Sequence, residues 1–263
     1  VQRMRAPHWR EWLPPLDQMD RLEGEAALRA MELRYRIIAA ELRAVGIDVN
    51  CAPLADVARD VTHPVLLNRL YGRDPATVAA VARAVADGLL AGGVVPVLKH
   101  LPGYGLGAVD SHEDLPRVAA PREELEAVDF AAFRRLADLP LGMTAHIVYD
   151  AVDPDAPATL SPKAIRLIRE DLGFAGLLMT DDLSMNALPG TIGARARGAI
   201  DAGCDLILHC NGKRGEMEDV LAEAGTFDAD ALARGEAALA LRAGAGPLDI
   251  AAAEAEFHSL LQG

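Results

Sequence analysis

The chain has few aromatic residues and no excess of positive charge. Phe, Trp and Tyr make up 4% of its 263 residues, and 39 acidic against 26 basic side chains give a net charge of -13. An acidic chain of this kind has no cluster of basic side chains that could neutralise the phosphates of a nucleic acid. It is equally unsuited to an anionic membrane surface. We therefore expect neither nucleic acid nor a membrane among its partners.

Cysteine is also scarce. The chain has three cysteines, an odd number, and each lies in or beside an apolar run: Cys51, Cys204 and Cys210. This favours buried free thiols over a disulfide framework or a metal site. No apolar stretch approaches the ~20 residues of a membrane span, and no signal peptide is recognised at the start. We expect the compartment to be a reducing cytoplasm.

Short apolar runs alternate with helical stretches, which is the pattern of parallel strands joined by crossover helices. The runs are nearly continuous, as in strands covered on both faces. The expected strands are Gly46–Val57, Val94–His100, Leu141–Tyr149, Ala175–Asp182 and Cys204–Cys210. The expected helices are Asp17–Val45, Ala76–Ala91, Arg122–Leu136, Ser161–Leu172 and Thr191–Ala202. Ser161-Pro162 and Asp74-Pro75 are typical helix starts.

Polar residues follow the carboxyl end of every expected strand. They are Asp56, Lys99, His100, His146, Asp181, Asp182 and Asn211. A (β/α)8 barrel keeps its active site at this end of its strands. A doubly wound sheet binds its ligand at one switch point, and no G-x-G-x-x-G follows any strand here. We therefore predict an α/β fold of the (β/α)8 TIM-barrel type, with about five βα units in this chain.

The first motif is K-H-L-P-G-Y-G at 99–105, followed by D-S-H-E-D-L-P at 110–116. An imidazole near its neutral pKa can donate and then accept a proton, and a carboxylate nearby can fix its tautomer. His112 is thus a candidate general acid/base, with Asp110 as its orienting partner. The alternatives are a solvated loop, or a metal site of His100, Asp110 and His112 that the charge of Lys99 disfavours.

The second motif, G-L-L-M-T-D-D-L-S-M at 176–185, ends an apolar strand in the paired carboxylates Asp181 and Asp182. A carboxylate fixed at the end of a strand is held more rigidly than one on a loop. The alternative interpretation is that both carboxylates simply cap the helix that follows.

These two motifs, together with M-T-A-H-I-V-Y at 143–149, resemble the β-N-acetylhexosaminidases of glycoside hydrolase family 3. The resemblance implies a retaining mechanism with a covalent glycosyl-enzyme. It gives the role of nucleophile to Asp181, which directly follows the small hydroxyl residue of the motif. Asp182 would have a structural or hydrogen-bonding role, and the Asp110–His112 pair would replace the usual glutamate.

The resemblance also implies which residues bind the sugar. Lys99 and His100 would hold its hydroxyls. Arg69, in N-R-L-Y-G-R-D-P at 68–75, matches the R-S-F-G-x-D-P segment of the family, and its guanidinium suits two vicinal hydroxyls. The alternative for Arg69 is a salt bridge with Asp74 at the start of a helix. His146 either lines the sugar pocket or is a satisfied core histidine.

Two positions depart from the family pattern K-H-F-P-G-H-G, since Leu101 replaces Phe and Tyr104 replaces the second His. Tyrosine keeps a ring and a hydrogen-bonding tip. We therefore expect altered packing of the loop rather than lost chemistry.

The implied function is a cytoplasmic exo-β-N-acetylglucosaminidase that removes terminal N-acetylglucosamine from GlcNAc-1,6-anhydroMurNAc peptides in bacterial peptidoglycan recycling. No metal or organic cofactor is implied, the partner is a small-molecule sugar, and a monomer is expected. Two alternatives remain open, a β-N-acetylglucosaminide phosphorylase and an inactive sugar-binding barrel.

The start of the chain, V-Q-R-M-R-A-P at 1–7, is similar to a family segment that follows an earlier barrel strand. We therefore expect one catalytic barrel domain over residues 1–263 that lacks its first three strands. The acidic sugar-binding residue that the family has in those strands would then be absent too.

Overall fold

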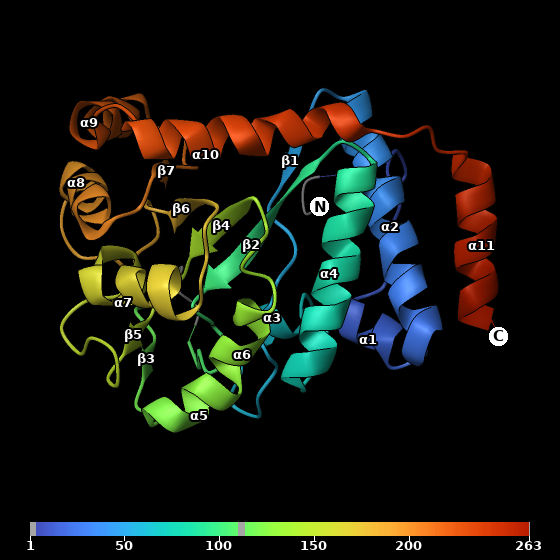
Figure 1. Ribbon diagram of the computed structural model, residues 1–263, viewed down its shortest axis with the longest axis horizontal. Helices are drawn as coiled ribbons and strands as arrows, with labels where there is room; N and C mark the ends of the chain where they lie inside the picture. The colour runs from blue at the N-terminus through green and yellow to red at the C-terminus, as the bar shows by residue number, and fades with distance from the viewer. Residues whose placement is uncertain (1–3, 110–113, 263) are drawn as a thin grey trace.

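A curled sheet of five parallel strands forms the centre of the molecule (Figure 1). The computed structural model describes residues 4–109 and 114–262. The strands lie in the order β1-β2-β4-β6-β7, and every neighbouring pair is parallel. Their bounds are Val49–Asn50, Val95–Leu101, Leu141–Thr144, Leu177–Asp182 and Leu206–Leu208. The predicted α/β architecture with five βα units is confirmed, as an open half-barrel.

Both faces of the sheet are covered, which explains the continuous apolar runs. Successive side chains point to opposite faces, so Val95 and Val97 face one way and Leu98 the other. Val95 and Val97 pack with Ala231 and Ala238 of α10 (Ala229–Ala240), which Figure 1 shows running along the upper edge of the sheet. The opposite face packs against the outer helices.

Two long helices, α2 (Gly24–Ala44) and α4 (Pro75–Ala91), lie side by side outside β1 and β2 (Figure 1). Gly88 permits their close approach, because a Cβ at this position would lie 2.4 Å from the carbonyl oxygen of Glu32. The last helix, α11 (Ile250–Gln262), packs on the far side of α2 through Phe257.

The remaining helices connect the strands and flank the half-barrel. They are α1 (Pro15–Met19), α3 (Pro64–Leu67), α5 (Arg122–Ala127), α6 (Asp129–Arg134), α7 (Pro162–Arg166), α8 (Ile192–Ala202) and α9 (Arg214–Ala224). The predicted starts at Asp74 and Ser161 are confirmed, since their side chains accept hydrogen bonds from Thr77 N and Ala164 N. A separate small sheet pairs β3 (Arg117–Val118) with β5 (Val148–Tyr149) in parallel.

Several predicted elements are shorter than expected. The strand predicted over Leu141–Tyr149 divides into β4 and β5, because β5 pairs with β3 in the second sheet rather than continuing along β2 and β6. The helix predicted over Asp17–Val45 is interrupted between α1 and α2, and the one over Arg122–Leu136 divides at Val128. The helices after residue 211, α9 to α11, were not predicted.

The three cysteines are free thiols, as predicted, but the prediction that all are buried is wrong. Cys204 is buried, whereas Cys51 and Cys210 are exposed. Both follow β1 and β7, the two edge strands of the sheet, each of which has a neighbouring strand on one side only.

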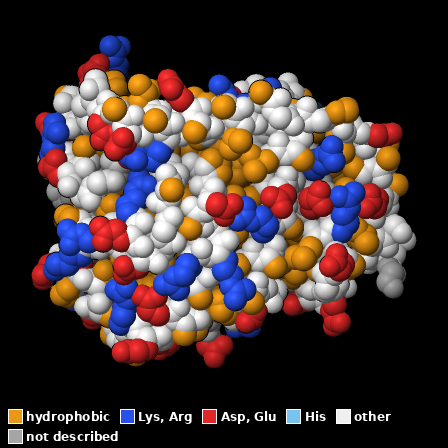
Figure 2. All heavy atoms as spheres, viewed as in Figure 1, with side chains coloured by type: hydrophobic (Ala, Val, Ile, Leu, Met, Phe, Trp, Pro, Cys, Tyr) orange, Lys and Arg blue, Asp and Glu red, His pale blue; other side chains and the backbone are white. Residues whose placement is uncertain are grey.

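The surface carries charges of both signs. Figure 2 shows Lys and Arg side chains interspersed with Asp and Glu on the visible face, with no continuous basic area there. Among the helices of residues 4–109 and 114–262, none is long and apolar enough to cross a membrane.

Candidate active site

The carboxyl ends of the parallel strands bring together polar side chains that are far apart in the sequence. Lys99 and His100 come from the end of β2, and Asp181 comes from the end of β6. His100 Nε2 lies 3.8 Å from Asp181 Oδ2. The predicted meeting of the two motifs at one rim is therefore confirmed for these residues.

Asp181 has the properties of an anionic nucleophile. One of its oxygens, Oδ1, accepts a hydrogen bond from the N–H of Asp182 at 2.8 Å. Burial raises the pKa of Asp181, but nearby positive charge, that of His100 foremost and of Lys99 as well, outweighs burial and holds the pKa below its usual range. The carboxylate is thus ionised at neutral pH.

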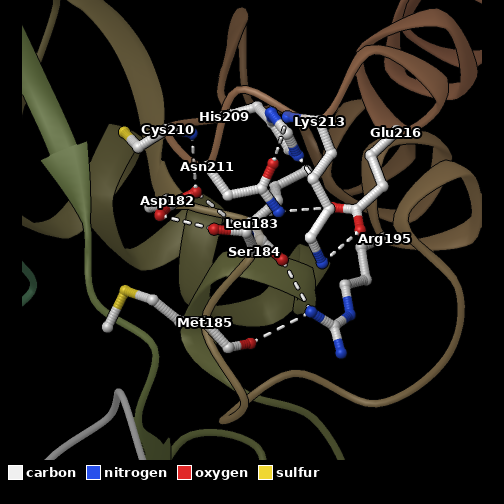
Figure 3. A network of polar contacts seen from close by, with 10 residues as sticks. All are labelled: Asp182, Leu183, Ser184, Met185, Arg195, His209, Cys210, Asn211, Lys213 and Glu216. Carbon is white, nitrogen blue, oxygen red and sulfur yellow. Dashed lines mark hydrogen bonds and ion pairs between the residues drawn. The ribbon is translucent and has the colours of Figure 1, made fainter.

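Asp182 is committed to hydrogen bonds within the protein (Figure 3). Its Oδ1 accepts from Ser184 N at 2.9 Å and from Cys210 N at 3.0 Å, and its Oδ2 accepts from Ser184 Oγ at 2.7 Å. Helix α8 begins ten residues later and is capped by Thr191. The alternative in which the two carboxylates cap that helix is therefore wrong, and the two residues differ clearly in their surroundings.

The loop after β7 is held by a second group of contacts, also drawn in Figure 3. Glu216 of α9 accepts from His209 at 3.1 Å, Asn211 at 2.5 Å and Lys213 at 3.0 Å. These hydrogen bonds lower the pKa of Glu216 to about 2. Arg195 of α8 fixes the neighbouring loop by donating to the carbonyl of Met185 at 3.0 Å. Asn211 thus lies at the rim, with its amide bound to Glu216.

His146 is buried, with 1% of its surface exposed. Its Nε2 lies 3.0 Å from the carbonyl oxygen of Asp182, and its Nδ1 lies 2.7 Å from Thr159 Oγ1. Burial lowers the pKa of this ring, so it is neutral, and the carbonyl can only accept. Nε2 therefore carries the proton, and Nδ1 lies against the hydroxyl of Thr159. Both nitrogens are occupied, which favours the core interpretation, and a sugar contact of His146 stays a prediction.

Arg69 and Lys99 line a cavity of about 730 Å³, together with Asn68 and Cys51. The alternative salt bridge between Arg69 and Asp74 is wrong, because Asp74 instead caps α4 by accepting from Thr77 N at 2.8 Å. In the described part of the chain, neither cation has an ion-pair partner. Both side chains line the cavity, where a ligand can contact them.

The predicted acid/base His112 and its partner Asp110 lie outside the described residues. The segment that leads to them is firmly anchored. Tyr149 donates to the carbonyl of Gly103 at 2.6 Å, and Thr62 donates to that of Gly105. Gly105 is required here, since a Cβ would lie 2.0 Å from the carbonyl oxygen of Val57.

Tyr104, the residue that departs from the family pattern, is buried beside the site. Its hydroxyl donates to the carbonyl of Val109 at 3.1 Å, and its ring lies 5.8 Å from that of His100. The tyrosine thus packs against the histidine to which the resemblance gives a sugar-binding role, and a change of loop packing relative to the family stays a prediction.

Two buried carboxylates behind the site had no predicted role. Asp56 contacts His100, at 2.8 Å between Oδ2 and Nδ1. Asp129 pairs with Arg59 at 2.9 Å, and its side chain is 0% exposed. Burial raises the pKa of Asp129 to about 6, the charge of Asp56 adds to this, and Arg59 opposes it. The position of Asp56 after an apolar run was a usable signal, whereas nothing in the sequence marks Asp129.

A metal site is not formed within residues 4–109 and 114–262, where no three His, Cys, Asp or Glu side chains come together suitably. The alternative metal site of His100, Asp110 and His112 rests in part on residues that the structure does not describe.

The fold and the cluster define the class of protein. The chain is a barrel-type α/β protein whose polar site lies at the carboxyl ends of parallel strands, with an ionised carboxylate, an imidazole and Lys99, which lines a cavity together with Arg69.

Comparison with known proteins identifies the family. The sequence profile described as Glycosyl hydrolase family 3 N terminal domain matches residues 12–232. A beta-hexosaminidase of Alkalilimnicola ehrlichii is 43% identical over 180 residues, which are 66% of this chain and 51% of that protein. One of Methylococcus capsulatus is 41% identical over 216 residues, 80% of this chain and 64% of that protein. The chain belongs to glycoside hydrolase family 3.

A solved structure agrees. NagZ from Neisseria gonorrhoeae in complex with N-trifluoroacetyl-D-glucosamine matches with a TM-score of 0.80 at 34% identity, over 95% of this chain and 76% of that one. Of the two beta-hexosaminidase relatives, this chain spans about half of the one from Alkalilimnicola ehrlichii and just under two thirds of the one from Methylococcus capsulatus.

Proposed function

We propose that the protein is a retaining β-N-acetylhexosaminidase in which Asp181 is the nucleophile. The observation that carries the proposal is the contrast between the two adjacent carboxylates. Asp181 is ionised and lies 3.8 Å from His100, whereas the carboxylate of Asp182 is engaged by Ser184 and Cys210. Only one of them is free to attack a sugar.

The reaction would proceed in two steps. In the first, Asp181 attacks the anomeric carbon, and His112 donates a proton to the leaving oxygen. In the second, His112 removes a proton from water, which attacks the same carbon and releases the sugar and Asp181. Lys99, His100 and Arg69 would hold the sugar hydroxyls, with the two cations of the cavity as the main support for this assignment.

The proposed substrate class is terminal β-linked N-acetylglucosamine, and its finer form is the GlcNAc-1,6-anhydroMurNAc peptide. The N-acetylglucosamine analogue in the Neisseria NagZ structure and the beta-hexosaminidase relatives support the sugar. The three free thiols fit the proposed cytoplasmic location. We also propose that residues 1–263 are part of one catalytic barrel domain.

The test uses 4-nitrophenyl N-acetyl-β-glucosaminide with the wild-type protein and the variants Asp181→Asn and Asp182→Asn. We expect nitrophenol release by the wild type and Asp182→Asn and none by Asp181→Asn. Free N-acetylglucosamine as the product, at a rate independent of phosphate, supports the hydrolase. The sugar 1-phosphate as the product would identify a phosphorylase, and no turnover by the wild type would overturn the proposal.

A further inference from the structure

A buried carboxylate, Asp56, lies behind His100 on the side away from Asp181. The segment that carries it runs along β2, since Lys99 N donates to the carbonyl of Pro53 at 3.0 Å and Ala55 N donates to that of Lys99 at 2.8 Å. The Asp56 side chain is 0% exposed. It therefore faces the protein interior and cannot contact a substrate.

Both carboxylate oxygens of Asp56 contact the same residue. Oδ2 lies 2.8 Å from His100 Nδ1, and Oδ1 accepts from the main-chain N–H of His100 at 3.3 Å. The carboxylate thus fixes the main chain and the ring of the histidine together. A carboxylate accepts hydrogen bonds, so Nδ1 carries a proton.

The consequence is that Nε2 is the nitrogen that faces the site. It lies 3.8 Å from Asp181 Oδ2, which is too long for a direct hydrogen bond. A sugar hydroxyl that contacts Nε2 would therefore lie beside the carboxylate of Asp181. The ring can thus present Nε2 to a sugar only while Nδ1 stays bonded to Asp56.

We propose that Asp56 is a positioning residue for the glycosidase reaction, acting through His100. It fixes the proton on Nδ1 and aims Nε2 at the sugar and at Asp181. This rests on the proposed function, but it does not depend on the assignment of His112.

The surroundings of Asp56 restrict the ring further. The ring of Tyr104 lies 5.8 Å from that of His100. Asp129 lies near enough for the negative charge of Asp56 to act on it, and Arg59 pairs with Asp129 at 2.9 Å. The buried carboxylate of Asp56 therefore lies near a second buried carboxylate, that of Asp129, which Arg59 pairs, and burying two such charges close together is costly.

The first test requires no substrate. Nitrogen-15 NMR of the histidine rings reports which nitrogen carries a proton in the ligand-free protein. We expect His100 to carry one on Nδ1 in the wild type, assigned by the signals lost in His100→Ala, and to change its proton distribution in Asp56→Asn. A wild-type ring protonated only on Nε2 overturns the proposal even if the variant does not fold.

The second test is a double-mutant cycle on kcat/KM for 4-nitrophenyl N-acetyl-β-glucosaminide. We expect Asp56→Asn to lower kcat/KM by about 10- to 100-fold, as for other partners that orient a histidine. His100→Ala should lower it at least as much. In the His100→Ala background, Asp56→Asn should change it by less than about 2-fold, because the residue acts through the ring. If the fold-losses of kcat/KM in the two single variants instead multiply in the double variant, Asp56 does not act through His100 and its role is merely structural.

The matched control is Asp153→Asn. Asp153 is also a buried carboxylate, and it accepts from Ser161 at 2.6 Å and pairs with Lys163 at 3.2 Å. We expect kcat/KM within about 2-fold of the wild type for this variant, despite a comparable loss of buried hydrogen bonds. Failure of the wild type to turn over the glycoside would overturn the proposed function alone, because the NMR result still decides the role of Asp56.

Discussion

The carboxylate of Asp182 and the main-chain N–H of Cys210 are joined by a hydrogen bond of 3.0 Å, which ties the end of β6 to the loop after β7. The same carboxylate also holds both donors of Ser184. Asp181 is therefore presented to the site by a neighbour whose own side chain is fully engaged. Within this pair of adjacent aspartates, Asp182 therefore has a structural role, and Asp181 is the one whose carboxylate faces the site.

The first prediction concerns this pair. Asp181→Ala should abolish turnover of every N-acetylglucosaminide, since no glycosyl-enzyme can form. Asp182→Ala should lower the free energy of unfolding by about 1–3 kcal/mol through lost hydrogen bonds, and slow the reaction without stopping it. Urea denaturation and mass spectrometry of the protein with a slow fluorosugar substrate measure the two effects. Loss of covalent trapping in Asp182→Ala would contradict the assignment.

A second prediction separates the steps of the reaction. An activated nitrophenyl leaving group scarcely needs a proton, whereas the alkoxide of a natural disaccharide does. His112→Ala should therefore lower the first-step rate for the disaccharide by about 10²- to 10⁴-fold and affect the nitrophenyl glycoside far less. Single-turnover kinetics with both substrates provide the measurement. Equal slowing of the two would show that His112 is not the general acid.

The rim of the site was predictable from the sequence, but the contacts behind it were not. The strand ends at Lys99 and Asp181 were predictable, because parallel strands present their carboxyl ends at one edge. The partner of His100 was not, since Asp56 is 44 residues away and its contact depends on how the segment after β1 runs along β2. Asp129 lies 70 residues from Arg59, at the start of a helix with no distinguishing pattern.

The two wrong predictions, buried Cys51 and Cys210 and one continuous strand over Leu141–Tyr149, have a similar origin. An apolar run predicts that a strand is covered on both faces, but it does not reveal that β1 and β7 are edge strands. The exposed Cys51 and Cys210 follow these two strands. The division of β4 from β5 reflects the pairing of β5 with β3 in a second sheet, which a period-two pattern does not encode.

The exposed thiols give a third prediction. N-ethylmaleimide should label Cys51 and Cys210 in the native protein but not Cys204, which is buried and whose pKa burial raises to about 12. Labelling of Cys210 should accelerate as pH rises, because burial raises its pKa to about 11 and the thiolate is the reactive form. Peptide mass spectrometry identifies the labelled sites. In urea all three should react, and labelling of Cys204 without urea would contradict the fold.

Arg69 supplies a fourth prediction. Arg69→Ala should lower kcat/KM for an N-acetylglucosaminide by about 10- to 100-fold, since one bidentate contact to the sugar would be lost. Stability should change by less than about 0.5 kcal/mol, because Arg69 makes no ion pair in the described part of the chain. Arg73→Ala is the matched control, as its pair with Asp60 at 3.4 Å is exposed. A similar loss of kcat/KM in both variants would remove Arg69 from the proposed sugar site.

The last prediction concerns pH and the buried carboxyl of Asp129. Its pKa is raised to about 6 in the folded protein, from an ordinary value of 3.8, so the folded state binds more protons than the unfolded state between these values. Stability contributed by this group is therefore present at low pH and decreases as pH rises towards and past 6. Asp129→Asn cannot titrate and should lack this decrease.

The comparison that isolates Asp129 is the difference in unfolding free energy between Asp129→Asn and the wild type. Between pH 4 and pH 7, the unfolding free energy of the variant should rise relative to that of the wild type by about 2–3 kcal/mol. This is the free energy that corresponds to a shift of about two pKa units. Other carboxylates titrate in both proteins and cancel in the difference. Urea denaturation at a series of pH values measures it, and Asp60→Asn, which removes an exposed carboxylate that pairs with Arg73, serves as the control. A difference that does not vary with pH would mean that Arg59 keeps Asp129 ionised throughout this range.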